Sequence, residues 1–256
     1  KLVRLKRSQR TQHENLLIAL LFSFGTSVFF SSVRGEVWFT ALILGYFFHL
    51  IYIYLSLEAR HPILAGLLLA FGMATRTPIA FASAFFALEL FRLPDWPTRI
   101  RTGLKFSMPI LAIGMLLILY NIARFGSPSE FGHTFLMDGQ RPSIREWGLF
   151  HPHFLVGNLK AAFTNLPEFS SSYPYVKISR HGLSIFAASP ALLYLFFPKR
   201  WTQGMTACLV ALICVATPAL FYQNTGWAQY SYRFSIDYLP YLAMLLACGG
   251  RRLGRP

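Results

Sequence analysis

The sequence predicts an all-α polytopic membrane protein, a bundle of about eight transmembrane helices with one large extracytoplasmic loop. Hydrophobic residues make up 54% of the 256 residues and charged residues only 13%, about half the share usual in a soluble domain. Stretches of roughly twenty apolar residues recur along the chain, the length a helix needs to cross a bilayer. The formal charge of +14 lies mainly in short clusters between these stretches, as the positive-inside rule predicts. A nucleic-acid-binding protein would gather its basic residues on one polar face, so nucleic acid is excluded as a partner.

The first two predicted spans follow a basic start. Five basic residues within 1–15 place this segment on the cytoplasmic side: Lys1, Arg4, Lys6, Arg7 and Arg10. Apolar stretches at 16–33 and 37–57 predict the first and second spans, joined by the polar turn Arg34-Gly35-Glu36.

The stretch 63–91 is too long for one ordinary span and is interrupted by Thr75-Arg76-Thr77-Pro78. Proline removes a helical donor and disfavours helical angles in the residue before it, and a charge in mid-membrane is costly. The sequence therefore predicts two short helices with Arg76 at their outer apex. A basic loop at 92–105 returns the chain to the cytoplasm, and the fifth span is expected at 106–123.

Residues 124–181 are polar, contain proline and glycine, and lack a long apolar stretch. They are predicted to form the extracytoplasmic loop, with an amphipathic helix at 156–166 lying on the membrane surface. Further spans are expected at 182–197, 205–222 and 235–249. Basic residues after the sixth and eighth spans place both termini in the cytoplasm: Lys199, Arg200, Arg251, Arg252 and Arg255. The whole chain, 1–256, is predicted to be one domain.

Cysteine, histidine and aromatic residues do not form a recognisable catalytic or metal motif. Three cysteines lie within apolar stretches, where we expect them to pack: Cys208, Cys214 and Cys248. Three loop histidines lack a spaced carboxylate or cysteine partner, so no metal site is predicted: His133, His151 and His153. Three aromatic residues fit either an interfacial aromatic belt or a sugar-stacking surface: Trp227, Tyr230 and Tyr232.

Ionisable residues at the predicted span ends converge on the outer side. They are Arg34, Glu36, Arg76, Arg124, Glu130, Arg233 and Asp237. Ionisable groups near the hydrocarbon boundary are candidates for function, and a guanidinium group donates a fork of hydrogen bonds that matches a phosphate. Arginines at helix ends can also simply extend to water, and the sequence leaves both interpretations open. Arg76 is the strongest candidate because it lies at a helix break.

Four segments together carry a family resemblance. They read GLLLAFGMATRTP at 66–78, YNIARFGSPSEFG at 120–132, GLSIFAASPALL at 182–193 and YSYRFSIDYLP at 230–240. In this order they resemble motifs of bacterial membrane glycosyltransferases of the GT-C superfamily, relatives of the protein O-mannosyltransferases and the lipid A aminoarabinose transferase. The resemblance implies transfer of a hexose or pentose from a polyprenyl-phosphate donor to an envelope lipid, glycan or protein acceptor. This transfer would take place at the outer face of a bacterial inner membrane.

The resemblance also implies roles for individual residues. Arg76 and Arg233, and then Arg124, would contact the donor phosphate, and Glu36 would orient donor or acceptor. Glu130 and Asp237 complete the expected substrate-binding set. The family's catalytic carboxylate follows its first span, and the matching loop is not evident here. We therefore expect that carboxylate upstream of Lys1 and expect residues 1–256 alone to be inactive.

Two other functions stay open. A transporter or flippase of lipid-linked saccharides would show paired broken helices in two halves of the chain. A non-catalytic membrane scaffold would leave the outer arginines and Glu36 scattered and unpaired.

Overall fold

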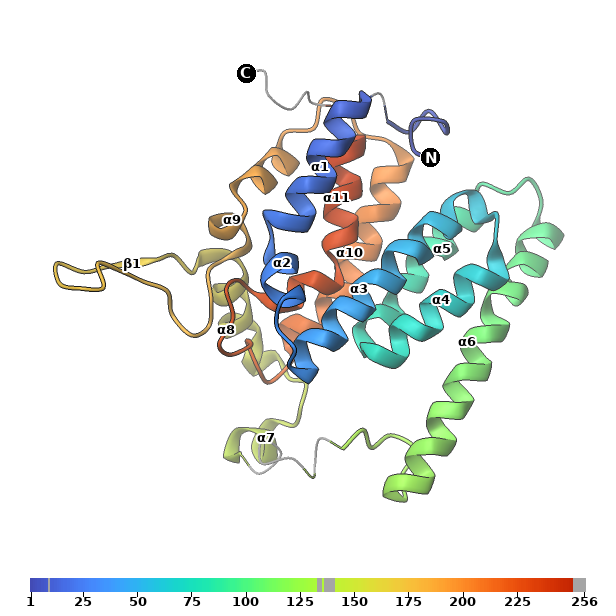
Figure 1. Ribbon diagram of the computed structural model, residues 1–256. Helices are drawn as coiled ribbons and strands as arrows, with labels where there is room; N and C mark the ends of the chain where they lie inside the picture. The colour runs from blue at the N-terminus through green and yellow to red at the C-terminus, as the bar shows by residue number, and fades with distance from the viewer. Residues whose placement is uncertain (9, 133–134, 136–140, 251–256) are drawn as a thin grey trace.

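The computed structural model describes residues 1–8, 10–132, 135 and 141–250, and these are mostly helical (Figure 1). Three helices are long and apolar enough to cross a membrane: Val37–Ala59, Trp96–Phe125 and Gln203–Phe221. Three shorter apolar helices accompany them: Pro62–Thr75, Thr77–Leu90 and Leu239–Cys248. The prediction of a helical protein with membrane-spanning segments is confirmed at this coarser level. Arg251, Arg252 and Arg255, expected on the cytoplasmic side, lie outside the described residues.

The apolar stretch 16–33 forms two helices instead of the single one predicted. The helix α1 (Gln12–Phe24) begins at a capping box of Thr11 and Glu14 and ends at Gly25, and α2 (Ser27–Ser32) follows. The Thr26 hydroxyl donates to the Phe22 carbonyl at 2.8 Å and accepts from the Val28 amide. Glycine weakens a helix and the threonine side chain supplies alternative partners for the backbone, so the helix breaks here.

The stretch 37–91 forms a three-helix unit, and the predicted break at Arg76 is confirmed. The helix α3 (Val37–Ser56) continues into η1 (Leu57–Ala59), and α4 (Pro62–Thr75) packs along it. Arg76 is extended, with φ −145° and ψ 101°, before η2 (Thr77–Ala82) and α5 (Ser83–Leu90). The Glu58 amide donates to the Glu89 carboxylate at 2.7 Å. Glu58 lies between α3 and α4, and Glu89 lies in the last turn of α5. The hydrogen bond between them shows that the end of α5 lies close to the start of α4.

The helix α6 (Trp96–Phe125) is longer than the predicted span at 106–123. Asp95 caps its start by accepting from the Thr98 amide at 2.8 Å and the Thr98 hydroxyl at 2.9 Å. These hydrogen bonds hold the pKa of Asp95 below its ordinary value. Most of the predicted basic loop is therefore helical, since the cap and the Trp-Pro pair at the first turn favour a start at this point.

The last third of the chain completes the core. Pro190 follows α9 (Ile185–Ala188) and opens η7 (Pro190–Phe196), so the span predicted at 182–197 is an interrupted 3-10 segment. The helix α10 (Gln203–Phe221) matches its prediction, and η8 (Arg233–Asp237) leads into α11 (Leu239–Cys248). The largest fully buried side chains belong to Tyr52, Tyr232 and Tyr241. They lie on or beside α3, η8 and α11, so the core lies where these elements meet α10.

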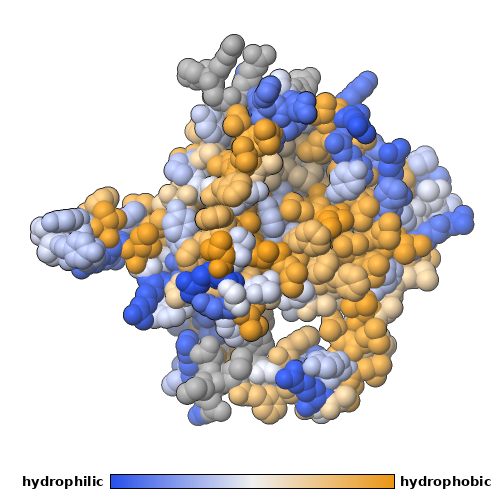
Figure 2. All heavy atoms as spheres, in the orientation of Figure 1, coloured by the Kyte–Doolittle hydropathy of each residue, from blue (hydrophilic) through white to orange (hydrophobic). Residues whose placement is uncertain are grey.

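The predicted loop region contains short elements. They are α7 (Pro142–Trp147), η5 (Pro152–Phe154), α8 (Leu155–Leu159), η6 (Lys160–Thr164), and an antiparallel pair of β1 (Glu168–Phe169) and β2 (Val176–Lys177). The helices α8 and η6 cover most of the amphipathic segment predicted at 156–166. Figure 2 shows hydrophobic side chains over the middle of one face, with hydrophilic residues gathered chiefly toward its ends.

Candidate functional site: an arginine cluster at the start of helix α3

The turn between α2 and α3 holds an arginine over two aromatic rings. Arg34 donates from Nη2 to Glu36 Oε1 at 2.6 Å. Its guanidinium carbon lies 5.3 Å from the ring centroid of Phe30 and 5.4 Å from that of Phe39. The Glu36 side chain is 52% exposed, so this pair contributes little to stability. The two rings and the carboxylate together position the Arg34 guanidinium.

Arg76 and Asp237 form a forked ion pair inside the bundle. Arg76 Nη2 lies 2.7 Å from Asp237 Oδ2, and Nε lies 3.2 Å from Oδ1. The Asp237 side chain is fully buried and that of Arg76 is 20% exposed. Arg76 extends past Gly45 of α3, where an added Cβ would lie 2.9 Å from Arg76 Cγ. The helix break at Arg76 and the small residue at Gly45 together let the guanidinium reach η8.

Arg233 lies between the two preceding pairs. Its guanidinium carbon is 5.2 Å from the Phe39 centroid and 5.5 Å from the Phe234 centroid. Arg76 contacts the same Phe234 ring, also at 5.5 Å. Phe39 thus links Arg34 to Arg233, and Phe234 links Arg233 to Arg76. We name these five charged residues the Arg233 cluster: Arg34, Glu36, Arg76, Arg233 and Asp237.

The charge balance of the Arg233 cluster favours an anion. Both carboxylates already pair with Arg34 or Arg76, whereas Arg233 makes a 3.4 Å hydrogen bond to the Trp227 carbonyl. Its Nε is buried and has no acceptor within the described part of the chain. Three guanidinium groups face two carboxylates, so a bound phosphate or carboxylate would supply the missing acceptor.

An apolar groove adjoins the Arg233 cluster. It has a volume of about 320 Å³ and is lined by Phe24, Gly25, Thr26, Phe29, Phe30, Val33, Ala188 and Tyr230. Phe30 belongs both to this groove and to the contact with Arg34. The α1–α2 break at Gly25 lines the groove as well. A molecule with an anionic head and a hydrocarbon chain could therefore contact the cluster and the groove together.

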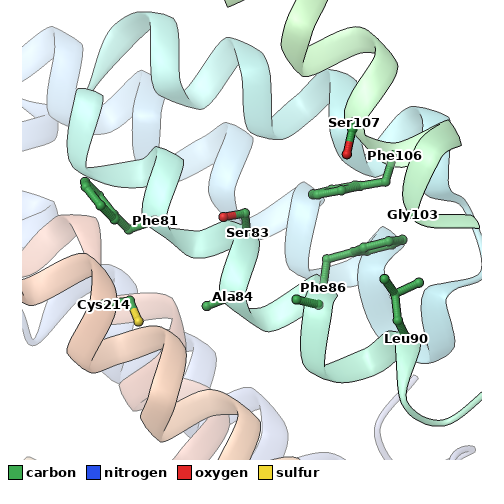
Figure 3. A pocket seen from close by; sticks show the side chains of 10 residues that line it. Phe81, Ser83, Ala84, Phe86, Leu90, Gly103, Phe106, Ser107 and Cys214 are labelled. Atoms are coloured by element: carbon green, nitrogen blue, oxygen red, sulfur yellow. The ribbon is translucent and has the colours of Figure 1, made fainter. Parts of the chain in front are cut away.

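A second apolar pocket lies between α5, α6 and α10 (Figure 3). Its volume is about 360 Å³. Phe86 and Phe106 stack at 3.9 Å on one side, and Cys214 of α10 lies across the opening. Ser83, Ser107 and Cys214 are the residues with polar side chains in its lining. The arrangement suits a hydrocarbon chain and offers no charged group for chemistry.

The structure does not bring Arg124 and Glu130 into the cluster. Arg124 donates to the Tyr120 hydroxyl at 3.0 Å and lies over the Phe125 ring at the end of α6. Figure 1 shows this end of α6 standing away from α2 and α3. Glu130 follows in the segment that leaves α6. The two residues predicted from the YNIARFGSPSEFG segment therefore lie apart from Arg233.

The aromatic and histidine candidates divide among separate environments. Tyr232 is fully buried, and its hydroxyl donates to the Ala219 carbonyl at 3.1 Å, so the membrane-boundary interpretation is wrong for it. Tyr230 packs on Phe30, and Trp227 is half exposed. His151 and His153 flank Trp147 in the loop, and His133 lies outside the described residues. The searched part of the chain holds no group of three metal-binding side chains.

Glu89 is the main charged residue that sequence reasoning missed. Its side chain is fully buried and accepts from both terminal nitrogens of Arg7, at 3.0 and 2.7 Å, and from Arg92 Nε at 3.1 Å. A carboxylate within the apolar stretch 63–91, three residues before an arginine, was the available signal. His49 is a second ionisable residue that sequence reasoning missed. It is fully buried in α3 and packs edge-on against Tyr241, with 4.9 Å between the ring centroids.

Comparisons with known proteins leave the family open. The chain matches no family model, and neither the curated proteins nor the solved structures gave a match.

Proposed function

We propose that the chain is part of a membrane glycosyltransferase and that the Arg233 cluster binds the phosphate of a polyprenyl-phosphate sugar donor. The observation that carries the proposal is Arg233, a largely buried guanidinium that shares two aromatic rings with Arg34 and Arg76 and forms no ion pair with a carboxylate among the described residues. A phosphate oxygen would accept from its buried Nε, so the ligand satisfies a donor that the protein leaves open.

We propose a place for each part of the donor. The phosphate contacts Arg233 and Arg34 beside Phe39, and the first prenyl units enter the groove lined by Phe30 and Tyr230. The sugar then extends toward Glu36, whose carboxylate is half exposed and binds Arg34 through Oε1, so that a sugar hydroxyl could donate to Oε2. Such bonds would orient the sugar toward an acceptor at the membrane boundary.

During transfer the acceptor oxygen bonds to the anomeric carbon, and polyprenyl phosphate leaves with the bonding electrons. The acceptor also loses a proton, and a general base speeds this step by about 10²–10⁴-fold. Asp237 is unsuited to that role because both of its oxygens accept from Arg76 and its side chain is fully buried. We therefore assign residues 1–256 the binding of donor phosphate, with the base supplied from elsewhere.

The proposal includes a topology. The hairpin of α4 and α5, the α9–η7 segment, the η8–α11 segment and the α1–α2 pair lie in the bilayer beside the three longer helices, which gives about eight crossings. The start of α3 faces the outer side of a bacterial inner membrane, and both termini face the cytoplasm. The hydrogen bond from Ser8 Oγ to the Ala247 carbonyl, at 2.9 Å, supports placing both ends of the described chain on one side.

Lipid binding tests the proposal. Purified chain would be incubated with polyprenyl monophosphate and the bound lipid measured by native mass spectrometry. Arg233→Gln should weaken binding about tenfold, because it removes a charge-assisted hydrogen bond. Arg124→Gln removes the same charge from an exposed site outside the cluster and should leave binding unchanged. Equal binding by wild-type and Arg233→Gln protein would refute the assignment.

A transporter or flippase of lipid-linked saccharides is the second candidate, and the break at Ser189-Pro190 between α9 and η7 favours it. Together with the break at Arg76, it gives one interrupted helix in each half of the chain, the feature expected of such transporters. A reconstituted protein that moves a fluorescent lipid-linked sugar between leaflets, without transferring the sugar, would support this candidate. The pairing of Arg34 with Glu36 and of Arg76 with Asp237 argues against the scaffold.

A further inference from the structure

A second group of arginines gathers where the N-terminal segment meets α10 and α11. Arg7 and Arg92 bind Glu89, as described above, and Arg10 donates from Nε and Nη2 to the Leu246 carbonyl at 3.2 and 2.6 Å. Arg200 lies beside Gly250. The positive charges of Arg7, Arg10 and Arg200 all act on the thiol of Cys248 at the end of α11. We name this group the Arg200 cluster: Arg7, Arg10, Glu14, Glu89, Arg92 and Arg200.

Two side-chain nitrogens of Arg200 lack a hydrogen-bond acceptor among the described residues, in a region that holds several other arginine donors. Its Nε and Nη2 are buried and have no acceptor in the part of the chain that the structure describes. The other arginines of the cluster take up Glu14, Glu89 and the Leu246 carbonyl. Four guanidinium groups thus face two carboxylates. Burial of guanidinium N–H groups without an acceptor is costly, so this site favours an added anion.

The N-terminus of α10 adds further donors. Thr202 caps this helix by accepting from the Met205 amide, which leaves the amides of Gln203 and Gly204 without a recorded acceptor in the described chain. A Cβ added at Gly204 would lie 3.7 Å from Arg7 Cδ and 4.0 Å from Arg92 Nη2. Two arginines therefore flank the first turn of α10, and Arg200 lies two residues before its cap. The positive end of a helix and adjacent arginines are matched to a phosphate.

The position of the Arg200 cluster identifies the source of that phosphate. The helix α3 begins beside Arg34 and ends at η1, whose Glu58 amide binds Glu89 of this cluster. Its 20 residues span about 30 Å, the thickness of a bilayer's hydrocarbon core. The two arginine clusters therefore lie about one membrane thickness apart, and the Arg200 cluster lies at the depth of lipid headgroups.

We infer that the Arg200 cluster is a binding site for the phosphate headgroup of an anionic phospholipid, with Arg200 and the first turn of α10 as its donors. The site is separate from the one proposed for the sugar donor. Bound lipid would join the N-terminal segment, α5 and α10 through one phosphate, and so stabilise this end of the bundle.

The experiment compares lipids retained by the purified full chain. Protein in phosphatidylcholine nanodiscs, with or without phosphatidylglycerol, would be transferred to detergent and its bound lipids measured by native mass spectrometry. Wild-type protein should retain phosphatidylglycerol in preference to phosphatidylcholine. Arg200→Gln should lower that preference about tenfold, and Arg200→Lys should recover part of it, because lysine keeps the charge without the fork. Arg101→Gln, an exposed arginine of α6, is the matched control and should behave as wild type.

Thermal unfolding of each variant in detergent establishes that it is folded, and polyprenyl monophosphate binding tests the other site. Arg200→Gln should leave polyprenyl binding unchanged, so failure of one proposal can be distinguished from failure of the other. Equal retention of the two phospholipids by wild-type protein would overturn the inference, as would an Arg200→Gln variant that retains as much phosphatidylglycerol as wild type. Displacement of the lipid by millimolar inorganic phosphate alone would overturn the assignment to a lipid.

Discussion

At the scale of single residues, two phenylalanines determine how three arginines share a small volume. Phe39 and Phe234 each contact two guanidinium groups, so the quadrupoles of their rings reduce the repulsion between like charges. Asp237 neutralises the most enclosed of the three, while Arg233 stays open to an anion. The sequence identified all five charged members of the cluster as candidates, because each lies beside an apolar stretch. It could not assign the pair Arg76–Asp237, whose members are 161 residues apart.

The Arg76–Asp237 pair should be important for stability. Asp237→Asn leaves a largely buried guanidinium without a counter-charge, and we expect a loss of about 3 kcal/mol in the free energy of unfolding. Glu36→Gln breaks a pair whose carboxylate is half exposed and should cost at most about 1 kcal/mol. Denaturant titration in detergent would measure both. A loss no larger for Asp237→Asn than for Glu36→Gln would contradict the structural role of the buried pair.

The lack of a side chain at Gly45 should be essential for the Arg76 side chain to reach Asp237. Alanine at this position would place Cβ 2.9 Å from Arg76 Cγ and 2.8 Å from Ile79 Cδ1. We expect a loss of about 1–3 kcal/mol in stability from overpacking and weaker binding of polyprenyl phosphate, since Arg76 must move. The matched control is Gly35→Ala in the preceding turn, where an added Cβ meets open space. Unchanged stability and binding in Gly45→Ala would show that the contact is not restrictive.

At the scale of elements, helices begin and end at residues that favour or disfavour helical backbone. Some of these residues could be recognised in the sequence. The break at Arg76 was predictable because a charge and Pro78 interrupt an apolar stretch. The break at Gly25 was not, because no charge or proline interrupts the stretch 16–33, and the Thr26 hydroxyl acts through hydrogen bonds to the backbone that the sequence does not reveal. The early start of α6 was missed because Arg99, Arg101 and Lys105 suggested a loop, although Asp95 and the Trp-Pro pair form a helix start.

The contact between α4 and α6 should depend on one small residue. A Cβ at Gly66 would lie 2.0 Å from the Phe106 carbonyl oxygen, whereas a Cβ at Gly114 of α6 meets nothing within 4 Å. Gly66→Ala should therefore push α6 away and lower stability, while Gly114→Ala should leave the fold intact or stabilise it by about 1 kcal/mol. Thermal unfolding of the two variants would compare them. An equal response would show that close approach of these backbones is dispensable.

At the scale of the whole molecule, the two arginine clusters lie at opposite ends of α3, whose 20 residues span about 30 Å, the thickness of a bilayer's hydrocarbon core. In the proposed topology, this separation would put the donor site and the phospholipid site in different leaflets. The overall helical class followed from composition alone. The helix boundaries did not, because three apolar stretches fold into shorter, interrupted helices whose ends lie at or beside Gly25, Pro190 and Asp237.

The proposal that the Arg233 and Arg200 clusters face opposite sides of the membrane can be tested by cysteine labelling. Gly35→Cys lies in the turn between Arg34 and Glu36, and Lys199→Cys lies beside Arg200, and both native residues are exposed. In intact cells a membrane-impermeant maleimide should label Gly35→Cys, and should label Lys199→Cys only after permeabilisation. The parent chain, with Cys208, Cys214 and Cys248 in place, measures background labelling. Labelling of both positions from the same side would contradict the topology.

The most direct measurement of the central claim is photo-crosslinking with polyprenyl monophosphate that carries a diazirine on the prenyl unit next to the phosphate. If the Arg233 cluster holds the phosphate, adducts should map to the groove lined by Phe29, Phe30 and Tyr230. They should disappear in Arg233→Gln and persist in Arg124→Gln. Adducts confined to α6 or to the end of the bundle near Arg200, or unchanged in Arg233→Gln, would contradict the account.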